Sequence, residues 1–308
     1  MRVAVAKYPI GMPVDFDAFA RRQAACLGEA KALGARIAVL PEYLSLELAA
    51  GFAAEVRSDL HASLVALQPL RQAWCDLYRR LARELDLYIV PGSFLLEVGE
   101  GRYRNRADWF APDGLHGWQD KLQLTGYEKS SGVIEPGDAL HGFDCDGHRV
   151  GIAVCYDVEF PLPVRAQYEA GVRLLLVPSC TDTAAGATRV RVGCLARALE
   201  NRFFVAQAVT AGEAAWSPAL DVNTGEATLY APMDHGFPAD GVLAATHGEA
   251  LWACHEIDLS ALERSRECAQ VANDRDWPAQ LAAPLRRWEE AIPLADGTPE
   301  TEQVPETA

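Results

Sequence analysis

Short apolar runs alternate along the chain with segments of helical periodicity. Buried strands are expected where the apolar runs stand between turn residues: RVAVAKYP at 2–9, RIAVLPEY at 36–43, LYIVPGSF at 87–94, VRLLLVPSC at 172–180 and RFFVAQAVT at 202–210. Apolar residues spaced three and four apart predict helices over 16–33, 64–86, 163–171 and 188–201.

Two segments predict β-hairpins, because residues 103–121 and 141–155 alternate in character around Asp-Gly turns. Further strands are expected within 225–232 and 249–258, and a helix over 259–267. Strands that alternate with helices, with hairpins mixed in, predict an α/β protein with mixed sheets. No Pro/Gly-rich linker divides residues 1–292, which are expected to form one domain. Residues 293–308, rich in Pro, Glu and Thr, predict a disordered or surface-draped acidic tail.

Composition narrows the possible partners. The 308 residues carry 28 basic and 43 acidic side chains, a formal charge of −15. This acidity argues against nucleic acid and anionic membranes as partners. No apolar run approaches the roughly 20 residues of a membrane span, and the N-terminus lacks a signal-like apolar segment, so a cytoplasmic protein is expected.

The cysteines and histidines give little support for a metal site. Eight cysteines are scattered without a CxxC pair, which is typical of reduced cytosolic thiols. His141 and His148 flank Cys145, but they surround an Asp-Gly turn, so a solvated hairpin tip is favoured over a zinc site. We expect neither a metal nor an organic cofactor.

Polar residues follow the apolar strands at several points. Glu42 comes after one run, Cys155 after another, and Ser179 and Cys180 after a third. Ligands bind beyond the carboxyl ends of strands in α/β sheets, so these side chains are candidates for one pocket. Taken alone, Cys155 is better interpreted as a small core residue, since cysteine is among the most buried residue types.

Three motifs resemble the signatures of the nitrilase superfamily of carbon–nitrogen hydrolases. They are PEY with Glu42, QDKLQL with Lys121 and VCYDVEFP with Cys155, in matching order and spacing. LARALENRFFVAQA is also similar to a family helix and strand, and the resemblance extends over about residues 2–260. It implies a four-layer αββα sandwich with two mixed β-sheets. It also implies a small-molecule substrate and a homodimer or higher homo-oligomer.

The resemblance implies roles for particular residues. Glu42 would be the general base, Lys121 the electrostatic stabiliser and Cys155 the nucleophile, with Glu128 as a second glutamate and the backbone N–H of Tyr156 beside the oxyanion. Substrate contacts are expected from Ser179, Cys180 and Thr181. Asp157 is expected to brace the turn that carries the nucleophile.

The residues after the nucleophile favour one branch. CYD-x-x-FP at 155–161 resembles amidase-type members, whereas nitrilases more often carry Trp-Glu-Asn after the cysteine. The expected reaction converts a small carboxamide to an acid and ammonia through a thioester acyl-enzyme. The alternatives are hydrolysis of an N-carbamoyl amine or a nitrile, and a catalytically silent binding or scaffold protein. Leu162-Pro163 and the stretch PSCTDT at 178–183 depart from the family pattern and leave the substrate open.

Overall fold

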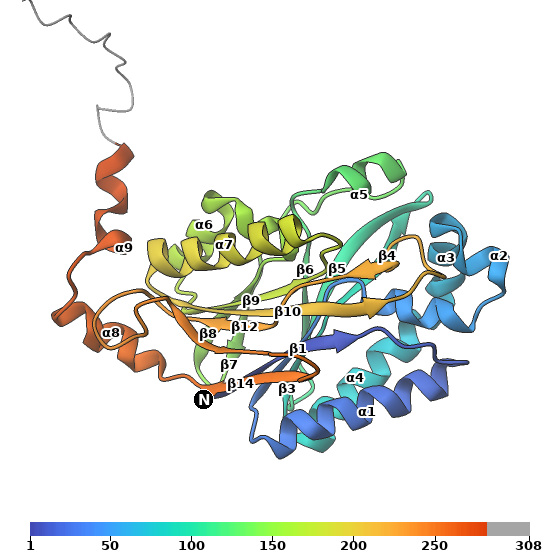
Figure 1. The fold of residues 1–308 in the computed structure, drawn as a ribbon, viewed down its shortest axis with the longest axis horizontal. Helices are drawn as coiled ribbons and strands as arrows, with labels where there is room; N and C mark the ends of the chain where they lie inside the picture. The colour runs from blue at the N-terminus through green and yellow to red at the C-terminus, as the bar shows by residue number, and fades with distance from the viewer. Residues whose placement is uncertain (282–308) are drawn as a thin grey trace, which may run out of the picture. The chain divides into compact units, whose positions relative to one another are not determined.

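The computed structural model describes residues 1–281 (Figure 1). Its strands are β1 (Arg2–Pro9), β2 (Ile37–Leu40), β3 (Tyr88–Pro91), β4 (Ser93–Gly99), β5 (Arg102–Phe110), β6 (His116–Asp120), β7 (Gly142–Cys145), β8 (His148–Ile152), β9 (Leu174–Ser179), β10 (Phe204–Glu213), β11 (Val222–Asn223), β12 (Thr228–Tyr230), β13 (Val242–Ala245) and β14 (Trp252–Glu256). Its α-helices are α1 (Phe16–Ala32), α2 (Ala54–Arg57), α3 (Leu60–Leu67), α4 (Arg71–Leu85), α5 (Gly126–Ser131), α6 (Pro161–Glu169), α7 (Ala184–Asn201), α8 (Leu259–Glu267) and α9 (Asn273–Asp276). Its 3-10 helices are η1 (Leu44–Gly51), η2 (Gln68–Leu70), η3 (Cys155–Glu159) and η4 (Trp277–Leu281).

The strands form a mixed arrangement, and the mixed α/β class is confirmed. Hydrogen-bonded neighbours follow one path, β4-β5-β3-β2-β1-β10-β9-β8-β7, with β6 and β14 paired beside it. The path passes through β1, which pairs with β14 along Arg2–Ala6 and with β10 along Lys7–Pro9. The expected pair of separate sheets is therefore joined by hydrogen bonds at β1.

Most of the strands that lead to the candidate residues run in one direction. β1 is parallel to β2 and β10, β2 to β3, β10 to β9, and β9 to β8. β6 is antiparallel to β5, which is antiparallel to β3, so β6 shares the direction of β3. The carboxyl ends of β2, β6, β8 and β9 therefore lie at the same edge, where a parallel α/β arrangement places its ligands.

Alternation along β1 separates two apolar layers. Val3 and Val5 pack in one core with residues of β8, β9, β10 and α7, whereas Ala4 and Ala6 pack in another with residues of α1 and α4. Successive side chains of a strand point to opposite faces, so β1 contributes to both. Figure 1 shows α1 and α4 on one side of the strands and α6 and α7 on the other.

Both hairpins and most of the predicted strands are confirmed, and several elements differ from expectation. The helix expected over 64–86 is divided into α3 and α4 by η2, where Pro69 lacks a backbone N–H and begins a new turn. α7 begins earlier than expected, because Thr183 accepts a hydrogen bond from the N–H of Gly186 and caps the helix. The buried segment η1 and the short strands β11 and β13 had no recognisable periodicity.

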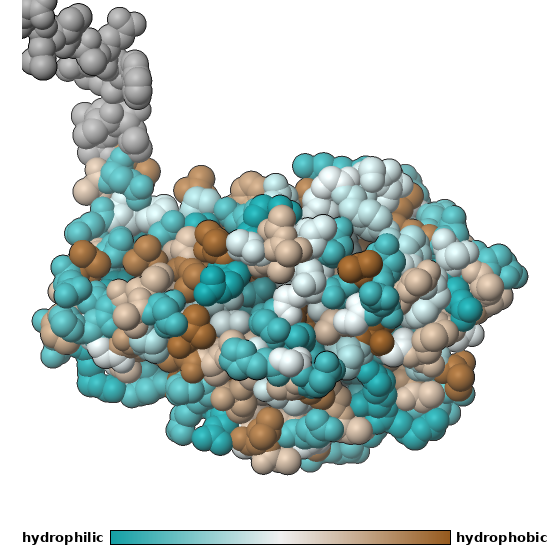
Figure 2. Space-filling model, in the orientation of Figure 1, coloured by the Kyte–Doolittle hydropathy of each residue, from teal (hydrophilic) through white to brown (hydrophobic). Residues whose placement is uncertain are grey.

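Residues Met1–Asp274 form a compact unit. The expected domain limit at residue 292 and the tail 293–308 lie outside the described residues. On the face seen in Figure 2, hydrophobic side chains occur in small groups among hydrophilic ones. Within residues 1–281, no helix combines the length and the apolar character needed to cross a bilayer.

Candidate active site

The candidate residues meet at the shared edge of the parallel strands. Glu42 follows β2 after one proline, Lys121 directly follows β6, and Cys155 begins η3 after β8. Cys180 directly follows β9. Residues separated by up to 138 positions in sequence are thereby in contact, since the N–H of Cys180 donates to Glu42 Oε2 at 3.0 Å.

A buried lysine lies between two carboxylates. Lys121 Nζ is 2.8 Å from Glu42 Oε1 and 2.8 Å from Glu128 Oε2. The side chains of Lys121, Glu42 and Glu128 are 1%, 1% and 0% exposed. A buried charge persists only when it is paired and hydrogen-bonded, so this trio is a specific arrangement rather than a solvated group of charges.

Three neighbouring side chains hold the carboxylates in place. Asn105 Nδ2, on β5, donates to Glu42 Oε1 at 2.8 Å and to Glu128 Oε1 at 3.2 Å. The Tyr43 hydroxyl donates to Glu128 Oε1 at 2.7 Å. Thr125 donates to Glu128 Oε2 from its backbone N–H at 2.9 Å and from its hydroxyl at 3.0 Å. Glu128 is thus surrounded by donors, while Glu42 faces the cavity.

The surroundings push the pKa values of the two glutamates apart. Burial raises the pKa of Glu42 and outweighs the opposing charge of Lys121, and the charge of Glu128 adds to the rise. Burial also opposes ionisation of Glu128, but Lys121 and the donors around Glu128 lower its pKa. Burial would lower the pKa of Lys121, yet the two carboxylates raise it well above its ordinary value. Glu42 is therefore the member of the trio suited to accepting a proton, and Lys121 stays charged.

Cys155 occupies a constrained turn. Its φ of 50° lies in the left-handed region, which is uncommon for a residue with a side chain. The thiol is 4% exposed, and Sγ lies 3.6 Å from the carbonyl oxygen of Cys180. Burial, and next the charge of Glu42, raise the pKa of the thiol well above its ordinary value. The resting side chain is therefore a neutral thiol.

Asp157 connects the nucleophile turn to the lysine loop. Its carboxylate accepts hydrogen bonds from the N–H groups of Val154 at 3.1 Å, Leu122 at 3.1 Å and Gln123 at 2.7 Å. Residues on both sides of the site therefore share one buried carboxylate. Burial raises its pKa to about 6, although Lys121 and the three N–H groups favour the charged form.

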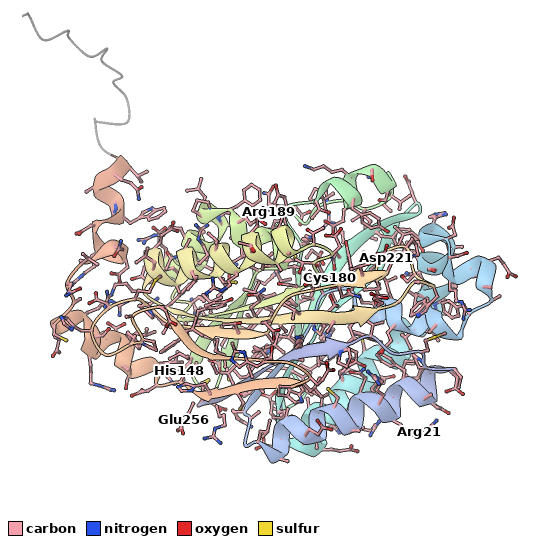
Figure 3. All side chains as sticks on the ribbon, in the orientation of Figure 1. Arg21, His148, Cys180, Arg189, Asp221 and Glu256 are labelled. Atoms are coloured by element: carbon pink, nitrogen blue, oxygen red, sulfur yellow. The ribbon has the colours of Figure 1, made fainter. Side chains whose placement is uncertain are left out.

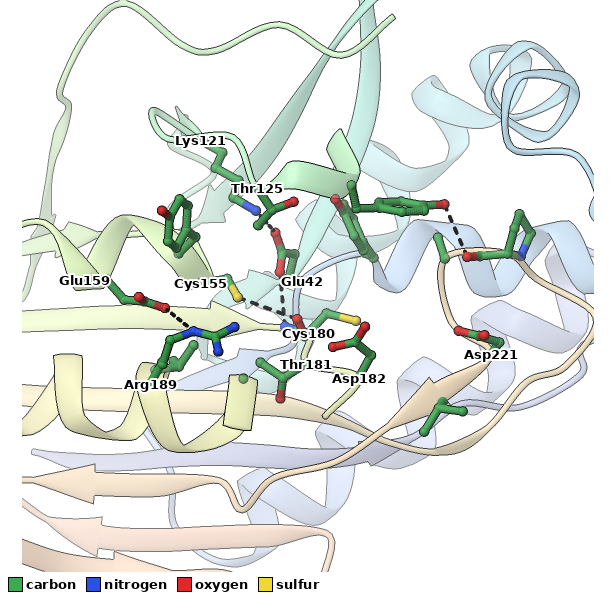
Figure 4. Close-up of a pocket in the computed structure, with 18 residues that line it drawn as sticks. Glu42, Lys121, Thr125, Cys155, Glu159, Cys180, Thr181, Asp182, Arg189 and Asp221 are labelled. Carbon is green, nitrogen blue, oxygen red and sulfur yellow. Dashed lines mark hydrogen bonds and ion pairs between the residues drawn. The ribbon is translucent and has the colours of Figure 1, made fainter. Parts of the chain in front are cut away.

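A cavity of about 280 Å³ opens onto these groups (Figure 4). Its inner part is lined by Glu42, Lys121, Cys155 and Cys180, and Figure 4 shows the thiol and the Glu42 carboxylate facing the same space. The outer part is lined by residues of α5, α7 and the segment before β11. Figure 3 shows Cys180, Arg189 and Asp221, from three separate segments, gathered in this region.

The structure brings together most of the residues selected from the sequence. Glu42, Lys121, Cys155, Tyr156, Cys180 and Thr181 line the cavity, and Glu128 contacts it through Lys121. Ser179 does not line it, because its side chain is fully buried and its hydroxyl donates to the carbonyl oxygen of Val177 at 3.3 Å. Ser179 is still part of β9, and the chain opens toward the cavity only at Cys180. The expected substrate contact from Ser179 is thus not found.

Sequence reasoning missed Asn105 and the contact made by Tyr43. Asn105 shares one buried face of β5 with Tyr103 and Ala107. A polar residue on the apolar face of an alternating strand was the available signal, because such a group must find buried partners. Within residues 1–281, no group of three or more His, Cys, Asp or Glu side chains, including those around His141, Cys145 and His148, has an arrangement that could hold a metal ion.

Comparisons with known proteins identify the family of this chain. The family model described as carbon-nitrogen hydrolase matches residues 2–245. The probable hydrolase YhcX of Bacillus subtilis is 28% identical over 277 residues, which cover 90% of this chain but only 53% of YhcX. Omega-amidase NIT2-A of Xenopus laevis is 27% identical over 271 residues, covering 85% of this chain and 91% of the relative.

The fold has solved counterparts. The crystal structure of Nit3 from Saccharomyces cerevisiae, described as a member of branch 10 of the nitrilase superfamily, superposes with a TM-score of 0.69. The match covers 89% of this chain and 96% of Nit3, at 18% sequence identity. At that identity the comparison supports the fold alone.

Proposed function

Because this chain belongs to the carbon-nitrogen hydrolase family, we propose that it is a cysteine-dependent amidase that converts a small carboxamide to an acid and ammonia. The family membership and the omega-amidase relative support an amidase-type hydrolase. The observation that carries the proposal is the placement of Lys121 between Glu42 and Glu128 at 2.8 Å from each, beside the cavity that contains Cys155.

In the first step, Glu42 would take the thiol proton while Cys155 Sγ attacks the amide carbon. The raised pKa of the thiol means that little thiolate exists beforehand, so removal of the proton has to accompany attack. The raised pKa of Glu42 makes it a stronger base than an exposed carboxylate. A histidine is therefore not required for this step.

The oxyanion formed by attack would be stabilised by Lys121 Nζ and the N–H of Tyr156. Tyr156 is in the first turn of η3, and N–H groups at the start of a helix have no partner within the helix. Donors of this kind are worth about 2.7–4 kcal/mol in the transition state. Asp157 accepts hydrogen bonds from both the lysine loop and the nucleophile turn, so it would fix the positions of Lys121 and the Tyr156 N–H relative to each other.

The second half of the reaction uses the same groups. Glu42 would give its proton to the departing nitrogen, so that the C–N bond breaks, ammonia leaves and a thioester to Cys155 remains. Glu42 would then remove a proton from water, which attacks the thioester, and the acid is released with the thiol restored. Glu128 stays ionised throughout and keeps Lys121 charged.

The proposal extends to architecture and assembly. The two apolar layers on either side of β1, with helices outside them, support a four-layer αββα arrangement. Leu162 on α6 and Val192 on α7 are 67% and 53% exposed, which supports a homodimer formed through the helices next to the nucleophile. Eight free thiols are consistent with a cytoplasmic protein.

Ammonia release from a panel of small amides, N-carbamoyl amines and nitriles tests the proposal, with the Cys155→Ala variant as the blank. Turnover of amides that the variant lacks is the expected result. Turnover of only carbamoyl compounds or nitriles would replace the amidase assignment with another activity of the superfamily. Absence of all turnover, together with failure of iodoacetamide to label Cys155, would support a silent binding protein.

A further inference from the structure

The lining of the whole cavity carries an excess of negative charge. Its lining contains four acidic residues, Glu42, Glu159, Asp182 and Asp221, and two basic ones, Lys121 and Arg189, which leaves a formal charge of −2. Lys121 is paired with buried glutamates, and Arg189 Nε lies 3.8 Å from Glu159 Oε1. Both cations of the lining thus already face carboxylates.

Asp182 and Asp221 have no such compensation. In the part of the chain that the structure describes, neither carboxylate takes part in an ion pair or a side-chain hydrogen bond. Both are exposed at the cavity mouth, and Figure 4 shows the two carboxylates on the same side of Cys155, beyond Cys180. They come from different segments, one after β9 and the other before β11.

The aromatic side chain of Tyr127 lies at the same negatively charged mouth of the cavity. Tyr127 lines the mouth, and its hydroxyl donates to the carbonyl oxygen of Pro218 at 3.2 Å. Burial and the nearby Asp221 raise the pKa of Tyr127 to about 12, so the ring stays a neutral phenol. A neutral aromatic ring beside a carboxylate is an arrangement that attracts an ammonium group.

Other residues make this cavity the candidate active site, because Glu42, Lys121 and Cys155 line it. We infer that its substrate is a small primary amide with a cationic amine at the end opposite the amide. The amine would lie between Asp182 and Asp221 at the mouth, with the amide carbon at Cys155. This inference rests on the proposed amidase function and specifies the substrate class of the same site.

A substrate with a negative charge at the end opposite the amide should bind less well. An amide whose far end is a carboxylate would meet Asp182 and Asp221 without a free cation among the described lining residues, and like charges in a cleft repel. A neutral amide of equal length should fall between the two. Charge at the far end of the substrate is therefore the variable to test.

The experiment measures kcat/KM at low ionic strength for 5-aminopentanamide, hexanamide and glutaramate, which are cationic, neutral and anionic primary amides of similar length. We expect 5-aminopentanamide to exceed hexanamide, and hexanamide to exceed glutaramate. In the Asp182→Asn/Asp221→Asn variant, the ratio of 5-aminopentanamide to hexanamide should fall about tenfold, and the ratio of glutaramate to hexanamide should rise. Asp17→Asn/Glu29→Gln, at two exposed positions on α1, is the control for the loss of two negative charges.

Several outcomes would overturn the inference while leaving the amidase function in place. One is an equal or higher kcat/KM for glutaramate, particularly if Arg189→Gln abolishes it, since Arg189 would then bind the carboxylate. Another is a substrate ratio that the double variant leaves unchanged. Failure of the proposed function is a separate result, because the enzyme would then hydrolyse no amide in either panel and Cys155 would not react with iodoacetamide.

Discussion

Replacement of Asn105 by leucine tests how the protein sets the basicity of Glu42. Asn105 Nδ2 donates to Glu42 Oε1 at 2.8 Å and to Glu128 Oε1 at 3.2 Å, and its side chain is fully buried. Leucine has nearly the same volume but no donor. It should therefore remove both hydrogen bonds without opening space for water.

The expected magnitude follows from the loss of a hydrogen bond to an ionised group. Such bonds are worth about 1.5–3 kcal/mol, and about 1.4 kcal/mol corresponds to one pKa unit. Lys121 still contacts the same oxygen of Glu42 and offsets part of the loss. Because the lost bond favoured the ionised carboxylate, the pKa of Glu42 should rise further in Asn105→Leu. The acid limb of the pH profile should then move to higher pH by about one unit.

The assay is kcat/KM for one amide substrate over a range of pH, compared between wild type and Asn105→Leu. The two glutamates interact, so the acid limb reports an apparent pKa of the pair. Gln207→Leu is a matched control, since Gln207 is a buried strand residue that accepts a hydrogen bond from Tyr230 at 2.7 Å away from the trio. An acid limb that stays at its wild-type pH in Asn105→Leu, or moves to lower pH, would refute the reasoning.

Three other changes give predictions of different kinds. Lys121→Met leaves two buried carboxylates without their cation, so it should abolish turnover and cost about 3–5 kcal/mol in urea unfolding, whereas Lys129→Met on the exposed side of α5 should do neither. Asp157 has a folded-state pKa of about 6 against an ordinary value of 3.8, so the stability that it contributes is present below about pH 4 and is lost as the pH rises through about 6. Wild-type stability should therefore fall by about 2.4 kcal/mol relative to Asp157→Asn between pH 4 and pH 7, measured by urea unfolding at each pH. Gly92→Ala should lower the free energy of unfolding by more than about 3 kcal/mol in the same assay, because Gly92 has a φ of +75° and a Cβ there would lie 1.8 Å from the Pro41 carbonyl oxygen. Gly101→Ala is the control. Gly101 has a φ of +70° but open space around it, so this change should cost about 1 kcal/mol.

Each of these predictions can fail in a distinct way. If Lys121→Met were as stable as the wild type, the two buried carboxylates would not need the charge of the lysine. A constant stability difference between wild type and Asp157→Asn across the pH range would mean that Asp157 does not titrate there. Equal costs for the two glycine variants would mean that the loop before Glu42 relaxes around the added methyl group.

The sequence located the residues of the candidate site more completely than the connections of the strands around it. Glu42 and Cys155 each end an apolar run, whereas Lys121 was identified only through the family resemblance. The shared direction of β2, β6, β8 and β9 brings the ends of these strands together. The hydrogen bonds that join the strands through β1 could not be predicted, because one strand changes neighbours along its length. The alternation of apolar and polar residues along a strand does not indicate which strands pair with it.

The hydrogen-bond partners of the buried glutamates and the lining of the cavity were harder to predict. Asn105 lies 63 residues from Glu42 in sequence and 23 from Glu128, and only the folded chain shows that it contacts both. Ser179 was expected at the cavity by its position next to Cys180. The pleat of β9 decides which of the two side chains reaches the opening, and burial of Ser179 shows that it is Cys180.

The proposed reaction requires that Cys155 form a covalent acyl intermediate. Acid quenching during turnover of the amide that releases ammonia fastest, followed by mass spectrometry of the intact chain and its peptides, tests it most directly. We expect a mass increase equal to the amide minus ammonia, located on the peptide that contains Cys155 and absent in Cys155→Ala. Amide turnover that persists in Cys155→Ala, or an acyl group found on another residue, would contradict it.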